Sequence, residues 1–295
     1  MLAFSSLLGN VEGQNIYRIW YDKPASYWEE ALPVGNGRIA AMVFGDPQLE
    51  QIQLNEETVS AGSPYQNYNE EAKTALPEMR RLIFEGKYEE AQNMAATKIL
   101  SQVGNEMPYQ TVGRLNIRYQ DHKKVNNYYR DLDISNAVAV TRYEVDGVEF
   151  TEETFASFTD QLVIRHIKAS KPGTINCELF FNTPMRDPKR SIYGKKGLRL
   201  EGITHGSRYF PGKVHYCADL DVKHKGGKVI TANDTLLSVQ GASELTLYIS
   251  MATNFVNYKD ISGDPYQRNK AYLKNAANDY INAKAARIGA YEDEF

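Results

Sequence analysis

The chain lacks several features that define small secreted, membrane-bound or nucleic-acid-binding proteins. Its 295 residues include two cysteines, Cys177 and Cys217, too few for a disulfide framework or for a zinc site on their own. No run approaches the ~20 apolar residues that a membrane helix needs, so we expect no membrane insertion. The net charge of -3 gives no electrostatic reason to expect nucleic acid as a partner.

The short motifs of catalysis and cofactor binding are also missing. There is no HExxH, paired CxxC, GxSxG or Walker loop, and the Gly-Asn-Gly-Arg stretch at 35–38 lacks the third glycine of a dinucleotide site. Neighbouring residues of a strand point to opposite faces, so Glu152-Glu153 cannot form a catalytic pair; we expect this pair to face solvent in part. The sequence therefore predicts no catalytic residue, no metal site and no cofactor.

What the chain does have is alternation of apolar and polar residues. Segments 174–181, 213–224 and 244–253 each place their apolar residues on one face, which predicts β-strands. Cys177 falls in such an apolar position and is expected to be a buried thiol. Asp146-Gly147 is typical of a two-residue hairpin turn. So many antiparallel strands with one apolar face predict two packed sheets.

Two segments have helical periodicity instead. From Asn69 to about Leu100 the apolar residues share one face, with Asn69 as the expected N-cap and Gly86 ending a first helix. Pro77 predicts a kink or a later start. Segment 263–295 carries an apolar stripe and reaches Phe295 without a capping signal. Because such a stripe usually needs a surface to pack on, we expect a further domain to follow.

These patterns divide the chain into three parts. Residues 1–15 are expected to be the remnant of a secretion signal or a disordered arm, since an apolar run extends from Leu2 to Leu8. Residues 16–262 form the β domain, with the helical insert at about 69–100. Residues 263–295 form a helical linker.

Segment 22–67 resembles the opening of proteins of glycoside hydrolase family 95, the α-L-fucosidase family. The family pattern is roughly Pro-Ala, Trp, Glu-Ala-Leu-Pro-x-Gly-Asn-Gly-Arg, Met-Val-Phe-Gly and Leu-Asn-Glu. The matching residues are Pro24, Ala25, Trp28, 30–38, 42–45, 54–56, Thr58, Gly62 and Pro64. Ser60 stands where the family has Trp, and Thr111 stands where it has Pro. The resemblance extends in order over nearly the whole chain, from residue 17 to 295.

The resemblance implies a mainly β fold, a two-sheet antiparallel β-supersandwich with a short helical insert and a C-terminal linker helix region. In the family, an (α/α)6 barrel follows and carries the catalytic groups. The chain would then be an accessory domain of an inverting α-L-fucosidase-like hydrolase, with that barrel and a fucosylated glycan as partners. Members of the family are secreted, so the resemblance also implies a secreted or periplasmic location. Two alternatives are a free-standing carbohydrate-binding β-sandwich and the N-terminal domain of a disaccharide phosphorylase.

Five residues around the Gly-Asn-Gly-Arg loop are candidates for a substrate rim or a domain interface. Composition alone favours a β-turn stabilised by Asn36 and by a salt bridge of Arg38. The resemblance implies instead that the loop supports or lines the catalytic cleft. In that hypothesis Arg38 pairs with a barrel residue or with Glu56, while Asn55 and Glu56 form a second polar wall beside Thr58.

Overall fold

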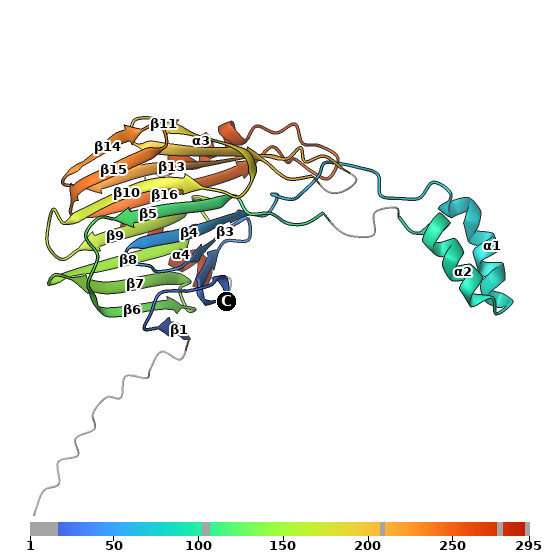
Figure 1. The fold of residues 1–295 in the computed structure, drawn as a ribbon, viewed down its shortest axis with the longest axis horizontal. Coiled ribbons are helices and arrows are strands. Elements are labelled where there is room, and N and C mark those ends of the chain that lie inside the picture. The colour runs from blue at the N-terminus through green and yellow to red at the C-terminus, as the bar shows by residue number, and fades with distance from the viewer. Residues whose placement is uncertain (1–16, 102–106, 207–209, 276–279, 293–295) are drawn as a thin grey trace, which may run out of the picture.

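A computed structural model describes residues 17–101, 107–206, 210–275 and 280–292 and contains two antiparallel sheets packed face to face (Figure 1). The arm expected at 1–15 lies outside these residues. The nine-stranded sheet has the order β1 (Arg18–Tyr21), β6 (Val125–Asp133), β7 (Val138–Val145), β8 (Val148–Ala156), β9 (Val163–Ala169), β16 (Glu244–Thr253), β13 (His215–Lys225), β12 (Gly197–Ile203) and β11 (Arg186–Tyr193). The seven-stranded sheet has the order β14 (Lys228–Asn233), β15 (Leu236–Ala242), β10 (Ile175–Asn182), β5 (Gly113–Tyr119), β4 (Leu49–Glu56), β3 (Ile39–Val43) and β2 (Leu32–Gly35). The predicted fold class is confirmed.

The core lies between the sheets and is built from the predicted alternation. In β10 the side chains of Ile175, Cys177, Leu179 and Phe181 are all at most 1% exposed, so Cys177 is a buried thiol as expected. The inward positions of β13 and β16 are buried in the same way. Asp146 and Gly147 both have positive φ, 49° and 76°, which is the geometry of the predicted two-residue turn.

The helical insert stands away from the sheets (Figure 1). It comprises α1 (Ala72–Phe84), α2 (Tyr88–Met94) and a π-helical turn (Ala95–Ile99). Asn69 caps the first turn as predicted, because its Oδ1 accepts from the backbone N–H of Glu71 at 3.0 Å and Glu71 already has helical φ and ψ. Asn69 also donates from Nδ2 to the carbonyl oxygens of Thr97 and Leu100, at 3.1 and 3.4 Å. It therefore closes the base of the insert.

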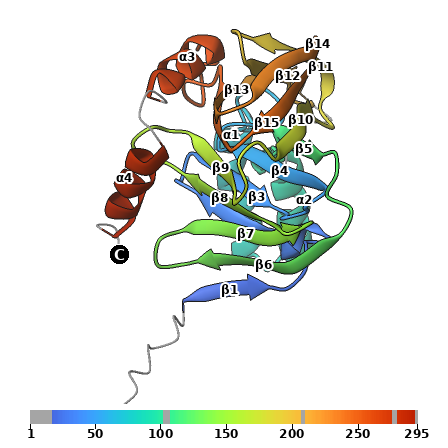
Figure 2. The same ribbon diagram turned by 90° about the vertical axis from the view of Figure 1, so that its left-hand side faces the viewer.

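The linker helices α3 (Pro265–Asn275) and α4 (Tyr280–Glu292) lie on the outer face of the nine-stranded sheet (Figure 2). Ala283 belongs to a second, smaller apolar cluster with residues of the sheet, and Tyr280 packs against it. The predicted stripe was partly wrong, since Ile281 is 73% exposed. The sheet itself covers the buried residues of the linker helices. None of the described helices is long and apolar enough to cross a membrane.

Short elements complete the fold. A 3-10 helix (Trp28–Glu30) leads into β2, and the sharp β2–β3 connection contains the Gly-Asn-Gly-Arg stretch. The turn predicted for this segment is therefore present. It puts residues 36–38 at the end of the sandwich where β4 and β16 also end.

Candidate functional site

Asn36 fixes the β2–β3 turn. Its Oδ1 accepts hydrogen bonds from the backbone N–H groups of Arg38 and Ile39, at 3.1 and 2.9 Å. Its Nδ2 donates to the carbonyl oxygen of Ser157 at 2.8 Å, in the connection between β8 and β9. The next residue, Gly37, has φ of 90°, which a residue with a side chain rarely adopts. Asn36 therefore holds the turn and ties it to the opposite sheet.

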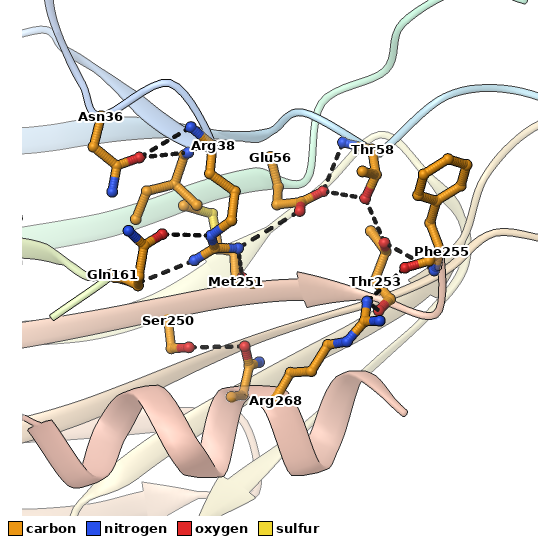
Figure 3. Close-up of polar contacts among 12 residues, drawn as sticks. Asn36, Arg38, Glu56, Thr58, Gln161, Ser250, Met251, Thr253, Phe255 and Arg268 are labelled. Atoms are coloured by element: carbon orange, nitrogen blue, oxygen red, sulfur yellow. Dashed lines mark hydrogen bonds and ion pairs between the residues drawn. The ribbon is translucent and has the colours of Figure 1, made fainter. Parts of the chain in front are cut away.

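Arg38 connects three parts of the chain through its guanidinium (Figure 3). Nε and Nη2 donate to the side-chain oxygen and the carbonyl oxygen of Gln161, at 2.7 and 3.2 Å. Nη1 donates to the carbonyl oxygen of Met251 at 2.8 Å. The guanidinium also lies over the ring of Tyr272 in α3, 4.5 Å from its centroid. Arg38 thus joins both sheets and the linker.

Glu56 is the buried carboxylate of this group, at 4% exposure. Its Oε1 lies 3.5 Å from Arg38 Nη1. Its Oε2 accepts from the backbone N–H and the hydroxyl of Thr58, at 2.8 and 2.6 Å. Burial raises the pKa of Glu56, and the contacts with Thr58 and Arg38 oppose that shift. The carboxylate is held by partners on both of its oxygens.

The two sheets and α3 are also joined through Thr253. Its hydroxyl makes a short hydrogen bond with the Thr58 hydroxyl across the sheets. Arg268 of α3 donates from Nη1 to the carbonyl oxygens of Thr253 and Phe255, at 2.8 and 2.6 Å. We call Arg38, Glu56, Thr58, Thr253 and Arg268 the polar seam.

A second contact fixes α3 deeper in the fold. Asn269 is fully buried. Its Oδ1 accepts from the Ser250 hydroxyl at 2.7 Å, and its Nδ2 donates to the carbonyl oxygen of Cys217 at 2.9 Å. A buried amide with donor and acceptor both paired specifies one position of the helix on the sheet.

An open cavity of ≈ 200 Å³ adjoins the polar seam. Glu57, Phe255 and Tyr272 line it together with all five seam residues and two others. Inverting hydrolysis of a glycosidic bond needs two carboxyl groups about 6.5–9.5 Å apart, one of them free to activate water. Glu56 is already committed to Arg38 and Thr58, so this arrangement is suited to holding the linker rather than to acid–base chemistry.

The predicted site residues are brought together in part. Arg38, Glu56 and Thr58 meet directly, and of the two partners expected for Arg38 the structure contains the pairing with Glu56. Asn36 lies beside them and holds the turn. Asn55 alternates with the buried Glu56 along β4 and is on the opposite face, so it does not join the polar seam.

Sequence reasoning missed the partners that come from distant segments. Gln161, Met251 and Arg268 lie more than 100 residues from Arg38, and none belongs to a recognisable motif. Gln161 has a positive φ of 59°, a conformation that costs a residue with a side chain about 1–3 kcal/mol. Its two hydrogen bonds from Arg38 offset that strain.

The two departures from the family pattern are accommodated locally. The Thr111 hydroxyl donates to the carbonyl oxygen of Leu54 at 3.0 Å and accepts from the Gly113 N–H at 3.2 Å, bonds that proline could not make. Ser60 forms a β-bridge with Tyr109. Both residues therefore stabilise the loops that lead to and from the helical insert.

Glu152 and Glu153 point to opposite faces of β8, as predicted. Glu153 faces outward and lies 2.6 Å from Lys284 of α4. The expectation of solvent exposure is wrong for Glu152, which is 2% exposed. It forms a close ion pair with the buried Arg165 and accepts from the Tyr119 hydroxyl at 2.5 Å. A cation on the neighbouring strand explains why this carboxylate can be buried.

Among the described residues no three His, Cys, Asp or Glu side chains are grouped as metal ligands.

Comparison with known proteins identifies relatives of the chain. Residues 19–258 match the family model described as glycosyl hydrolase family 65, N-terminal domain. Alpha-L-fucosidase 2 from Arabidopsis thaliana is 31% identical over 271 residues, covering 83% of this chain and 31% of that protein. A protein assigned as alpha-fucosidase A from Aspergillus niger is 25% identical over 302 residues, covering 94% of this chain and 37% of that protein. The resemblance to α-L-fucosidases is confirmed, and the chain spans about a third of the length of these relatives.

The fold also occurs in a solved structure assigned as a kojibiose phosphorylase from the human microbiome. The match has a TM-score of 0.50 and 10% identity, and it covers 95% of this chain and 38% of that one. At this identity the likeness concerns the fold alone.

Proposed function

The chain belongs to the glycosyl hydrolase family 65 N-terminal domain family, and from this we propose that it is the accessory domain of an inverting α-L-fucosidase-like glycoside hydrolase of family 95. In this proposal it supports the cleft of a catalytic (α/α)6 barrel that acts on terminal fucose of glycans, and it carries no catalytic residue itself. The names of the Arabidopsis and Aspergillus relatives support the fucosidase assignment.

The observation that carries the proposal is the commitment of Arg38 and Glu56 to contacts within the chain. Arg38 contacts Gln161, Met251 and Glu56, and the same group of residues holds α3 through Arg268. A sugar-binding or catalytic role would need these polar atoms free. Holding the first linker helix at a defined angle would instead orient whatever domain the linker carries, which is a supporting role.

The partners and the location are part of the same proposal. The catalytic barrel and a fucosylated glycan are the partners that follow from a fucosidase assignment, and action on such glycans suits a secreted or periplasmic protein. The phosphorylase alternative has the fold similarity in its favour. The Arabidopsis and Aspergillus relatives are named as fucosidases, which favours hydrolysis.

Fucose release tests the proposal. The purified 295-residue chain should release no fucose from 2′-fucosyllactose. A chimera in which this chain replaces the matching third of Arabidopsis alpha-L-fucosidase 2 should release it, because a supporting domain can be exchanged between relatives. Fucose release by the chain alone would overturn the accessory role. A folded chimera without activity would overturn the fucosidase assignment, and a phosphorylase origin would then be examined with kojibiose and phosphate.

A further inference from the structure

Three polar side chains form a row on the outer face of the seven-stranded sheet, across the neighbouring strands β4, β5 and β10 (Figure 1). Arg114 of β5 is directly opposite Gln53 of β4 and Asn182 of β10 in the strand pairing. All three alternate with buried residues of their strands, so their side chains point away from the core. Opposite residues of paired strands have Cβ atoms about 4.5–5.5 Å apart. The two amides therefore flank the guanidinium closely.

Arg114 has no counter-charge in the described part of the chain. Its Nη1 donates to Gln51 Oε1 at 2.6 Å, and its guanidinium lies 5.8 Å from the ring centroid of Phe44. These two neutral contacts hold the guanidinium in place but leave its charge unpaired. Arg118, four residues further along the same face, is instead paired with Glu178 at 3.1 Å. Arg114 is therefore available to an external anion.

A cavity of ≈ 310 Å³ is lined by the same three residues. Thr111, Thr183 and Pro184 also line it, and none of the described residues around it carries a carboxylate. Its volume is at the lower end of the range for small-molecule sites and exceeds what a bare inorganic anion fills. Arg114 and Asn182 are exposed, so a ligand in the cavity can reach their polar atoms.

The amides on either side of Arg114 supply further hydrogen-bonding groups. Neither Gln53 nor Asn182 makes a side-chain hydrogen bond to any residue that the structure describes. Each amide offers two donors and a carbonyl acceptor. The donors can join the guanidinium in binding a carboxylate, while the acceptors need a ligand that also brings hydroxyl groups. Pro184 adds an apolar surface against which the C–H groups of a ring can pack.

We propose that Gln53, Arg114 and Asn182 bind a sugar ring that carries a carboxylate, such as a uronic acid. The planar guanidinium matches a carboxylate through two parallel hydrogen bonds, and the amides bind the ring hydroxyls. A lone phosphate or sulfate ion would pair with the cation but leave the amide acceptors without donors. The linker helices lie on the other sheet (Figure 2), so the site is separate from the polar seam and does not depend on the proposed function.

A matched pair of ligands tests the charge requirement. Trigalacturonate and galactotriose with the same linkages differ only in the carboxylate or hydroxymethyl group that each ring carries. We expect an NMR chemical-shift titration of the isotope-labelled chain to show saturable binding of trigalacturonate. Galactotriose should bind at least roughly tenfold more weakly, because it cannot form an ion pair with Arg114. Binding of trigalacturonate should also weaken as the salt concentration rises.

A matched pair of arginine variants locates the site. R114A should weaken trigalacturonate binding roughly 10- to 100-fold, as expected for the loss of hydrogen bonds between charged groups. R118A removes an exposed arginine of the same strand and face that already has a carboxylate partner, so it should bind as the wild type does. Q53A should weaken binding roughly 2- to 10-fold, the range for neutral hydrogen bonds. Circular dichroism and unfolding midpoints establish that all variants are folded.

Four outcomes would overturn this site. The first two are an absence of trigalacturonate binding to the wild-type chain and equally tight binding of galactotriose. The third is an equal effect of R114A and R118A. The fourth is binding of triglutamate or inorganic sulfate as tight as that of trigalacturonate, which would show that the cavity selects a negative charge and not a sugar.

Discussion

Arg38 Nη1 lies 3.5 Å from Glu56 Oε1, where the ends of both sheets meet α3. The carboxylate is almost fully buried and the guanidinium side chain is 19% exposed. Removing one member of such a pair leaves the other charged and poorly solvated, which is more harmful than the pair itself is favourable. This ion pair therefore makes the end of the sandwich sensitive to single substitutions.

Arg38→Ala should lower the free energy of unfolding by about 2–4 kcal/mol, because Glu56 loses its counter-charge and Gln161 loses both hydrogen bonds. Urea unfolding followed by circular dichroism measures the change. Arg114→Ala is the matched control, since Arg114 is exposed and bonds to Gln51; its effect should stay below about 1 kcal/mol. Equal losses for the two variants would contradict the structural role of Arg38.

Glu56→Gln tests the pairing from the other side. If the interaction is direct, the free energy of unfolding should fall less in the double variant R38A/E56Q than the falls in the two single variants add up to. We expect a coupling of about 1–3 kcal/mol, the range for residues in one hydrogen-bonded ion pair. A double-mutant cycle in urea provides the value. Strict additivity would show that Arg38 acts through Gln161 and Met251 alone.

Glu50 makes stability depend on pH. It is fully buried, 3.5 Å from Arg165 and near the carboxylate of Glu152. Burial raises its pKa to about 7, and Arg165 only partly offsets this. Between pH 4.5 and 7 the folded chain retains a proton that the unfolded chain has released, so the free energy of unfolding falls as pH rises. The loss at pH 8 is at most about 3 kcal/mol.

The substitution Glu50→Gln should remove that dependence. Urea unfolding at pH 5 and pH 8 should show a smaller decrease for E50Q than for the wild type. Glu178→Gln is the control, because Glu178 pairs with Arg118 at the surface, and it should keep the wild-type decrease. The same decrease in E50Q as in the wild type would mean that Glu50 is not the titrating group.

Local pattern predicted much of the fold but less of the candidate site. Period-two alternation placed Cys177 and its neighbours in the core because burial of one strand face is decided by the strand's own residues. The same reasoning did not predict the burial of Glu152, because that burial depends on Arg165 in the next strand. Arg38 was identified through the family resemblance, yet Gln161 and Met251 became its partners only through sheet packing.

Helix α4 is a second case in which the sequence pattern did not predict which residues are buried. Its composition predicted a stripe through Ile281, but the surface offered by the nine-stranded sheet selects Ala283 and Arg287 as the buried positions. Where several faces of a helix are weakly apolar, tertiary packing decides which face is covered.

Asn269→Ala should loosen α3 without unfolding the sandwich. The change leaves the Ser250 hydroxyl and the Cys217 carbonyl oxygen without their partner, which costs about 2–3 kcal/mol, and this cost falls on the attachment of a single helix. Hydrogen exchange of residues 265–275 should then accelerate at least roughly tenfold, while exchange in β13 and β16 stays slow.

Lys270→Ala is the matched control, because Lys270 is exposed on the same helix and its loss should leave exchange unchanged. If α3 in N269A exchanged as slowly as in K270A, the buried amide would not be what holds the linker. The polar contacts of Arg268 and the ring of Tyr272 would then be sufficient to orient it. Faster exchange confined to α3 would identify Asn269 as the residue that sets the linker's position on the sheet, on which the supporting role of the domain depends.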